Sequence, residues 1–171
     1  TALDIGTGSG AIALSLLHER AVQQPVATDI SEDPLDVARG NAERCGLVER
    51  VDFRSGEGWR PVGNAEVFDI VISNPPYIAL EERPALQPEV RDWEPATALF
   101  APAEGLAVVR EIIRGAAAHL RSAGLLALEV AATHAQQVAD EIDRSHFGDV
   151  QVIRDLAGRA RVVTAVRKAD V

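Results

Sequence analysis

Apolar runs alternate with stretches of helical periodicity along the whole chain. The apolar runs are typical of buried strands, and they lie at Ala2–Ile5, Pro25–Asp29, Val51–Arg54, Val67–Ser73, Leu125–Val130, Val150–Arg154 and Arg161–Arg167. Apolar residues spaced by three and four predict helices over Ala11–Val22, from Asp33 to about Cys45, over about Ala103–Ser122, and around Ala135–Ile142. This alternation is typical of an α/β fold, in which helices cover both faces of a parallel sheet.

Capping and turn residues mark several of these predicted boundaries. Asp33 followed by Pro34 is expected to begin a helix, as a capping carboxylate with proline at the first helical position. Gly46 and Gly124 are expected to end the second and third helices, and Thr133 is placed to cap the fourth. A turn at 157–158 is expected to join the last two strands.

Composition limits the number of domains, the kinds of partner and the cellular compartment that we expect for the protein. Its 171 residues suit a single domain, residues 1–171, with its own core. With 17 basic and 26 acidic residues the net charge is −9, which disfavours an extended contact with nucleic acid or a membrane. The only cysteine, Cys45, excludes an internal disulfide and fits a reducing, cytoplasmic setting, and no metal site is expected because the histidines lack ligand spacing. No apolar run reaches the roughly 18–20 residues that cross a bilayer. The chain contains no Met, so we expect residues to precede Thr1.

A glycine-rich turn, Asp4–Gly10, links the first strand to the first helix. Glycines permit a tight turn and the close approach of a ligand to the backbone, and amides at a helix start can face an anionic group. Asp29 ends the second strand, where an acid can accept hydrogen bonds from both hydroxyls of a ribose. These features predict a ligand that contains a nucleoside, bound at the carboxyl ends of the strands.

Two such ligands compete for this turn. A dinucleotide site would use Gly6, Gly8 and Ala11. The acid and three alternate glycines at Asp4, Gly6, Gly8 and Gly10 resemble the pattern of known families that bind S-adenosylmethionine, and the chain matches that pattern better. A glycine-rich turn that binds nothing is the remaining interpretation.

A second motif, Asn74-Pro75-Pro76-Tyr77, directly follows the strongest predicted strand. Two prolines stiffen this turn and remove two N–H donors, so its carbonyls are left to accept hydrogen bonds from another group. The Asn74 side chain adds another acceptor oxygen. Converging acceptors beside an aromatic ring suit a planar –NH2 group, although a rigid turn with a packed tyrosine is the alternative. The proline-rich segment Tyr77–Pro102 that follows is expected to be a lid or a binding loop, or else a surface excursion.

Together these motifs resemble those of methyltransferases that use S-adenosylmethionine to methylate amide or exocyclic amino nitrogens. Within them the sequence is similar to the HemK/PrmC family, the protein N5-glutamine methyltransferases that act on peptide chain release factors. The resemblance runs over nearly the whole chain and rests on Asp4–Gly10, Asp29, Asn74–Tyr77, Val90–Pro95 with Ala98–Phe100, and Asp155–Arg159. The Asn-Pro-Pro-Tyr string alone does not separate glutamine from adenine as substrate, whereas the last two segments favour glutamine.

The resemblance implies a Rossmann-like fold, with a mostly parallel seven-stranded sheet whose last strand is antiparallel. It implies one catalytic domain, without the small helical N-terminal domain by which the family docks its substrate. The implied cofactor is S-adenosylmethionine, with S-adenosylhomocysteine as product. The residues implied to bind it are Asp4, Gly6, Thr7, Gly8, Ser9, Gly10, Asp29, Ile30, Glu57, Gly58 and Asn74. The residues implied to bind the substrate are Asn74, Pro75, Pro76 and Tyr77, of which Asn74, Pro75 and Tyr77 carry the catalysis. Family members often have Asp and a bulky residue where this chain has Glu57 and Gly58.

The expected reaction is methyl transfer to a glutamine side-chain amide of a release factor, in the cytoplasm. The alternative is methylation of an amino group, such as adenine N6, in DNA or RNA, and the charge of −9 counts against it. A nucleotide-binding module without catalysis, or a nicotinamide-dependent oxidoreductase, would leave the motif at Asn74–Tyr77 without a role.

Overall fold

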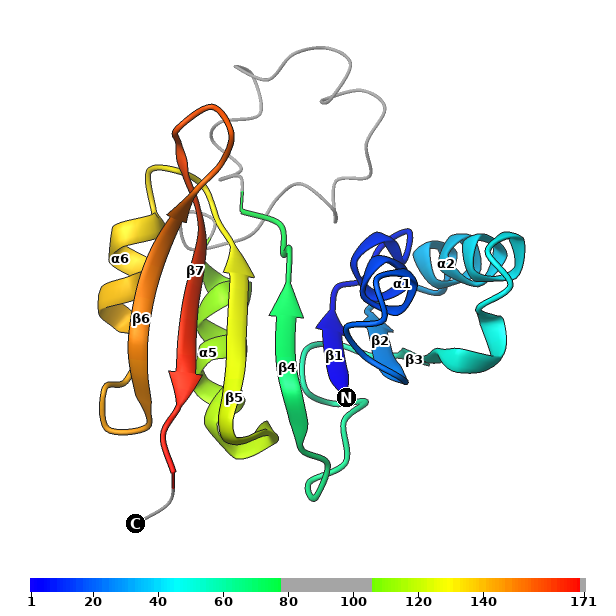
Figure 1. The fold of residues 1–171 in the computed structure, drawn as a ribbon, viewed down its shortest axis with the longest axis horizontal. Coiled ribbons are helices and arrows are strands. Elements are labelled where there is room, and N and C mark those ends of the chain that lie inside the picture. The colour runs from blue at the N-terminus through cyan, green and yellow to red at the C-terminus, as the bar shows by residue number, and fades with distance from the viewer. Residues whose placement is uncertain (78–105, 170–171) are drawn as a thin grey trace.

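The computed structural model describes residues 1–77 and 106–169, in which seven strands form one sheet (Figure 1). The strands are β1 (Ala2–Ile5), β2 (Pro25–Asp29), β3 (Asp52–Ser55), β4 (Phe68–Ser73), β5 (Leu120–Glu129), β6 (Phe147–Arg154) and β7 (Ala160–Arg167). Their order across the sheet is β3-β2-β1-β4-β5-β7-β6. The first five pair in parallel, and β7 runs antiparallel to both β5 and β6. The predicted Rossmann-like sheet with an antiparallel last strand is confirmed.

Helices cover both faces of this sheet, as the sequence predicts. Those in the described residues are α1 (Ala11–His18), α2 (Glu32–Arg44), α5 (Ala107–His119) and α6 (Ala135–Glu141), with a short 3-10 helix η1 (Val48–Arg50). Neighbouring residues of β1 point to opposite faces, because side chains alternate along a strand. Ala2 packs with Leu17 of α1, whereas Leu3 joins the larger core beneath α5 and α6.

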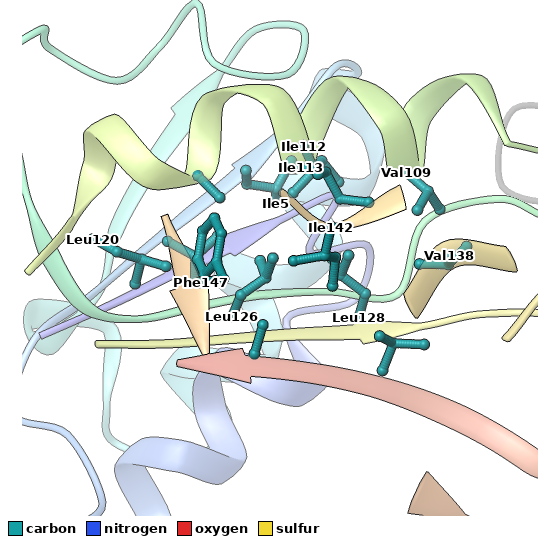
Figure 2. Packing of buried hydrophobic residues seen from close by; sticks show 14 of the residues in the cluster. Ile5, Val109, Ile112, Ile113, Leu120, Leu126, Leu128, Val138, Ile142 and Phe147 are labelled. Carbon is teal, nitrogen blue, oxygen red and sulfur yellow. The ribbon is translucent and has the colours of Figure 1, made fainter. Parts of the chain in front are cut away.

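The larger core lies between the sheet and the helices α5 and α6. Figure 2 shows Ile112 and Ile113 of α5 above Leu126 and Leu128 of β5, all of them buried. Phe147, at the start of β6, belongs to the same cluster (Figure 2). Complete burial of one such side chain contributes roughly 1.5–3 kcal/mol, so this layer fixes β4, β5 and β7 relative to one another.

The boundary between α5 and β5 differs from the prediction. Gly124 does not end a helix, because α5 stops at His119 and the strand has already begun at Leu120. The pairing of β4 with β5 shifts its register here, and Ala123 has a positive φ of 64°. A Cβ at Gly124 would lie 2.8 Å from the carbonyl oxygen of Arg121, so the irregular strand requires glycine at this point.

Three helix ends also differ. Ser31 is the N-cap of α2, so Pro34 is its third residue and not its first. α1 ends before Arg20, whose φ of 57° reverses the chain, and is therefore shorter than predicted. His134 and not Thr133 holds the N-cap position of α6. By contrast Gly46, with a φ of 68°, follows the C-cap of α2 as predicted.

Two predictions concern residues beyond the described part. The expected lid or binding loop, with Val90–Pro95 and Ala98–Phe100, lies within 78–105, and so does the predicted start of the third helix. Among the described helices, none combines the length and apolar character that crossing a bilayer requires.

Candidate active site

The two motifs singled out in the sequence lie side by side at one edge of the sheet. Ile5 pairs with Thr28 of β2 on one side and with Ser73 of β4 on the other. The glycine turn leaves β1 and Asn74 leaves β4 at this same edge, because parallel strands place their carboxyl ends together. The chain also crosses to opposite sides of β1 here, and such a switch point is the usual binding crevice of an open α/β sheet.

The glycine turn is bent by three residues of positive φ. Gly6, Gly8 and Gly10 have φ values of 72°, 56° and 80°. A Cβ at Gly6 or Gly8 would meet no atom within 4 Å, so the backbone at both positions borders open space. A Cβ at Gly10 would lie 3.0 Å from the Cβ of Ala38. The lack of a side chain at Gly6 and Gly8 therefore leaves room for a ligand. The lack of one at Gly10 lets α2 pack closely against the turn.

Asp4 lies beneath this turn and is fully buried. Its Oδ2 accepts hydrogen bonds from the Thr7 hydroxyl at 2.7 Å and from the Ala13 N–H at 3.2 Å. Its Oδ1 has no hydrogen-bond partner among the described residues. Burial raises the pKa of Asp4 to about 6, although the bonds from Thr7 and Ala13 oppose the rise. A buried acceptor without a partner is rare in native proteins and marks a place where a ligand group can bond.

Asp29 stands at the end of β2, facing the same turn. One carboxylate oxygen accepts from the Gly8 N–H at 3.0 Å and the other from the Ser31 N–H at 3.1 Å. A carboxylate has about four lone-pair positions, so two remain for other donors. Ile30 follows with 60% of its surface exposed, which offers an apolar face next to the acid. This pairing suits a nucleoside, with its ribose on Asp29 and its base near Ile30.

The loop after β3 approaches Asp29 from the other side. The Gly56 N–H donates to the Asp29 carbonyl at 2.8 Å. Glu57 is exposed and pairs with Arg60 at 3.0 Å. Gly58 has a φ of 53°, and a Cβ there would collide with the Glu111 carboxylate of α5. Residues 57–58 thus belong to a loop that Gly56 joins to the end of β2, next to Asp29.

Trp59 points away from this site. Its ring stacks on His119, with centroids 4.7 Å apart and planes 12° from parallel, and its N–H donates to the Glu111 carbonyl at 3.1 Å. The side chain therefore anchors the loop to α5.

The turn after β4 presents side chains of unequal exposure. Asn74 is exposed, Pro75 is buried, and Pro76 and Tyr77 are half-buried. Within residues 1–77 and 106–169, the Asn74 side chain forms no hydrogen bond, so its amide oxygen is available to a substrate. Ser73 ties the turn to the glycine loop, because its hydroxyl donates to the Ile5 carbonyl at 2.6 Å.

Sequence reasoning missed two residues that hold this turn. Ser73 is the last residue of an apolar strand. A small polar residue at that position could have been recognised in the sequence as one that holds the turn. Arg161, at the start of β7, places its Nη1 3.4 Å from the Tyr77 hydroxyl and its Cζ 5.4 Å from the centre of the ring. No spacing in the sequence connects residues 77 and 161. Residues 1–77 and 106–169 contain no group of three or more His, Cys, Asp or Glu side chains able to hold a metal ion.

Comparison with known proteins shows which proteins this chain resembles. A family model described as a methyltransferase domain matches residues 1–74. A release factor glutamine methyltransferase of Cereibacter sphaeroides is 45% identical over 96% of this chain, and one of Gloeobacter violaceus is 45% identical over 94%. Over nearly its whole length the chain is therefore similar to release factor glutamine methyltransferases, and its first 74 residues match a methyltransferase domain.

The curated relatives that it matches are longer than this chain. The chain spans 59% and 56% of the two relatives' lengths. A solved methyltransferase of Pyrococcus furiosus superimposes with a TM-score of 0.73, at 20% identity, over 99% of this chain and 75% of that protein. This structural likeness confirms the methyltransferase fold.

Proposed function

We propose that residues 1–171 form one catalytic domain that transfers a methyl group from S-adenosylmethionine to a glutamine side-chain amide of a peptide chain release factor. The observation that carries the proposal is the exposed Asn74 amide, which no described residue bonds, next to the open glycine turn. The names of the curated relatives support the substrate, and they favour it over an amino group in nucleic acid. A release factor as partner would place the reaction in the cytoplasm.

The residues at the edge of the sheet fit the methyl donor. The open space at Gly6 and Gly8 leaves room beside the backbone from Gly6 to Ser9, which includes Thr7, whereas Gly10 packs against α2. Asp29 retains acceptor positions for the two ribose hydroxyls, and Ile30 with residues 57–58 would border the adenine. Bound S-adenosylmethionine supplies an electrophilic methyl group on a sulfonium and becomes S-adenosylhomocysteine.

The turn at Asn74 would prepare the substrate nitrogen. An amide nitrogen is a poor nucleophile, because its lone pair is delocalised into the carbonyl. We propose that Asn74 Oδ1 and the Pro75 carbonyl each accept one hydrogen of the glutamine –NH2, which orients the nitrogen and favours a more tetrahedral geometry. Pro76 stiffens the turn, and the Tyr77 ring packs on the amide plane. Such alignment can supply about 7–11 kcal/mol of the barrier, and the proton leaves to water.

Labelled methyl donor tests the substrate. The full-length protein is incubated with it and with a release factor, with DNA or with RNA, and the modified residue is located by mass spectrometry. We expect label on a glutamine of the release factor and none in nucleic acid. Label on adenine would establish the alternative, and absence of label from all three would contradict the proposal.

Asn74→Ala tests the chemistry of the turn. We expect kcat to fall by about 100-fold or more, because a preorganised acceptor is lost, while the affinity for the methyl donor changes by only a few-fold. Asn64→Ala, at an exposed asparagine between β3 and β4, is the matched control and should keep normal turnover. Near-normal kcat in Asn74→Ala would refute the role of the side chain.

A further inference from the structure

We propose that Arg161 is a positioning residue, which fixes the Tyr77 ring in the orientation that the reaction needs. The contact itself is a property of the fold, and its effect on turnover rests on the proposed function. Arg161 comes from β7, 84 residues further along the chain than Tyr77.

The side chain of Arg161 bridges two segments that leave neighbouring strands. Its Nη1 lies 3.4 Å from the Tyr77 hydroxyl, after β4, and 3.3 Å from the Val130 carbonyl, after β5. Its Cζ is 5.4 Å from the centre of the Tyr77 ring, within the range of a cation–π contact. The backbone carbonyl of Arg161 also accepts from the Val130 N–H at 2.9 Å, so the backbone and the side chain of Arg161 both bond to Val130.

Asp155 holds the guanidinium from the opposite side. Its Oδ2 lies 3.9 Å from Arg161 Nε and 2.9 Å from Arg159 Nε. Its Oδ1 accepts from the N–H groups of Ala157 and Arg159, each at 2.9 Å. The backbone hydrogen bond from Arg159 is the main reason that the pKa of Asp155 lies below its usual value. The carboxylate is therefore fixed in the β6–β7 turn and stays charged at neutral pH.

Tyr77 needs such a support because the prolines before it restrain only the backbone. Proline fixes its own φ, and the χ angles of the following tyrosine stay free. The bridge from Asp155 through Arg161 removes that freedom from the Tyr77 ring without adding a group that touches the substrate. A lysine could not replace it fully, because an ammonium lacks the planar fork that meets a hydroxyl, a carbonyl and a carboxylate together.

Steady-state kinetics test the catalytic consequence in the full-length protein. We expect Arg161→Gln to lower kcat for methylation of a release factor by about tenfold, with the KM for the methyl donor unchanged, because the site of the donor is untouched. Arg161→Lys should recover part of the loss. Arg114→Gln, at an exposed position of α5, is the matched control and should leave kcat unchanged. An unchanged kcat in Arg161→Gln would overturn the proposal.

The tyrosine ring gives a second readout, independent of turnover. Tyr77 is the only tyrosine of this chain, so ring-labelled tyrosine yields an NMR signal that Tyr77→Phe assigns. We expect this signal to shift or broaden in Arg161→Gln and to stay in place in Arg114→Gln. An unperturbed signal would also overturn the proposal. Should the wild-type protein bind the methyl donor yet leave the release factor unmodified, the proposed function alone would fail, and the ring signal would still decide the role of Arg161.

Discussion

Asp4 combines complete burial with a carboxylate oxygen that no described group bonds. Its pKa of about 6 in the folded chain exceeds the ordinary value of 3.8, so the folded state holds the proton more tightly than the unfolded state. Below pH 3.8 both states are protonated, and the group does not affect stability. Between pH 3.8 and about pH 6 only the unfolded chain loses the proton, so stability falls as the pH rises. Above that window the ionised group costs about 3 kcal/mol.

Asp4→Asn tests this cost. The carboxamide is uncharged and keeps an oxygen for Thr7 and Ala13, so we expect it to raise the free energy of unfolding at pH 7 by roughly 1–3 kcal/mol. The gain should disappear at pH 4, while affinity for the methyl donor falls. Urea denaturation at both pH values measures the effect, with Asp149→Asn, at an exposed position, as a control expected to stay within about 0.5 kcal/mol. An equal gain at both pH values would contradict the conclusion that the ionised, buried carboxylate of Asp4 causes the loss of stability.

At the scale of elements, the glycine turn must both leave space for a ligand and let α2 pack closely against it. Gly8 borders open space and Gly10 faces α2, yet both have a positive φ. We expect Gly8→Ala to cost about 1 kcal/mol of stability and to weaken binding of the methyl donor. Gly10→Ala should cost about 1–3 kcal/mol more, since its Cβ also presses on Ala38. Denaturation with urea measures the loss of stability, and calorimetric titration measures the loss of affinity for the donor. Equal losses of stability in the two variants would show that α2 shifts to accommodate the Cβ at residue 10.

The strands were predictable from sequence where local chemistry decides their ends. β1 and β2 match the prediction at both ends, because a glycine turn follows Ile5 and a proline begins β2. Gly124 was misread because a glycine after a helical pattern resembles a helix end. Its actual position depends on the register between β4 and β5, which is a property of two distant segments.

The candidate site was likewise predictable from sequence only where residues directly follow a strand. Asp29 and Asn74 follow strands, and the carboxyl ends of parallel strands necessarily meet, so their proximity could be inferred from the order of the elements. Arg161 could not be found in this way. It reaches Tyr77 because β7 inserts between β5 and β6, and no periodicity in the sequence encodes that insertion.

At the scale of the whole molecule, β1 divides the sheet into two halves. The side with β2 and β3 carries the groups suited to the nucleoside, and the side with β4, β5 and β7 carries the proposed substrate turn (Figure 1). Binding and turnover should therefore respond to different substitutions, since well-separated groups contribute independently.

Thermal unfolding tests ligand binding at the side of the sheet with β2 and β3, separately from turnover. A ligand at 100 times its Kd stabilises the folded state by about 2.7 kcal/mol, so we expect S-adenosylhomocysteine to raise the Tm by several degrees. NAD should cause no shift, because a dinucleotide is not the expected ligand. Asp29→Ala should abolish most of the shift by removing the acceptor for the ribose hydroxyls. A larger shift with NAD would favour the oxidoreductase alternative.

The placement of β7 also bears on how the protein is made. β6 pairs only with β7 in the described sheet, and β7 comes later along the chain. While a ribosome is still producing residues 160–167, β6 has nothing to pair with and Tyr77 lacks its guanidinium. A nascent chain can thus pair β1 to β5 first, and Arg161 reaches Tyr77 only when β7 has inserted between β5 and β6.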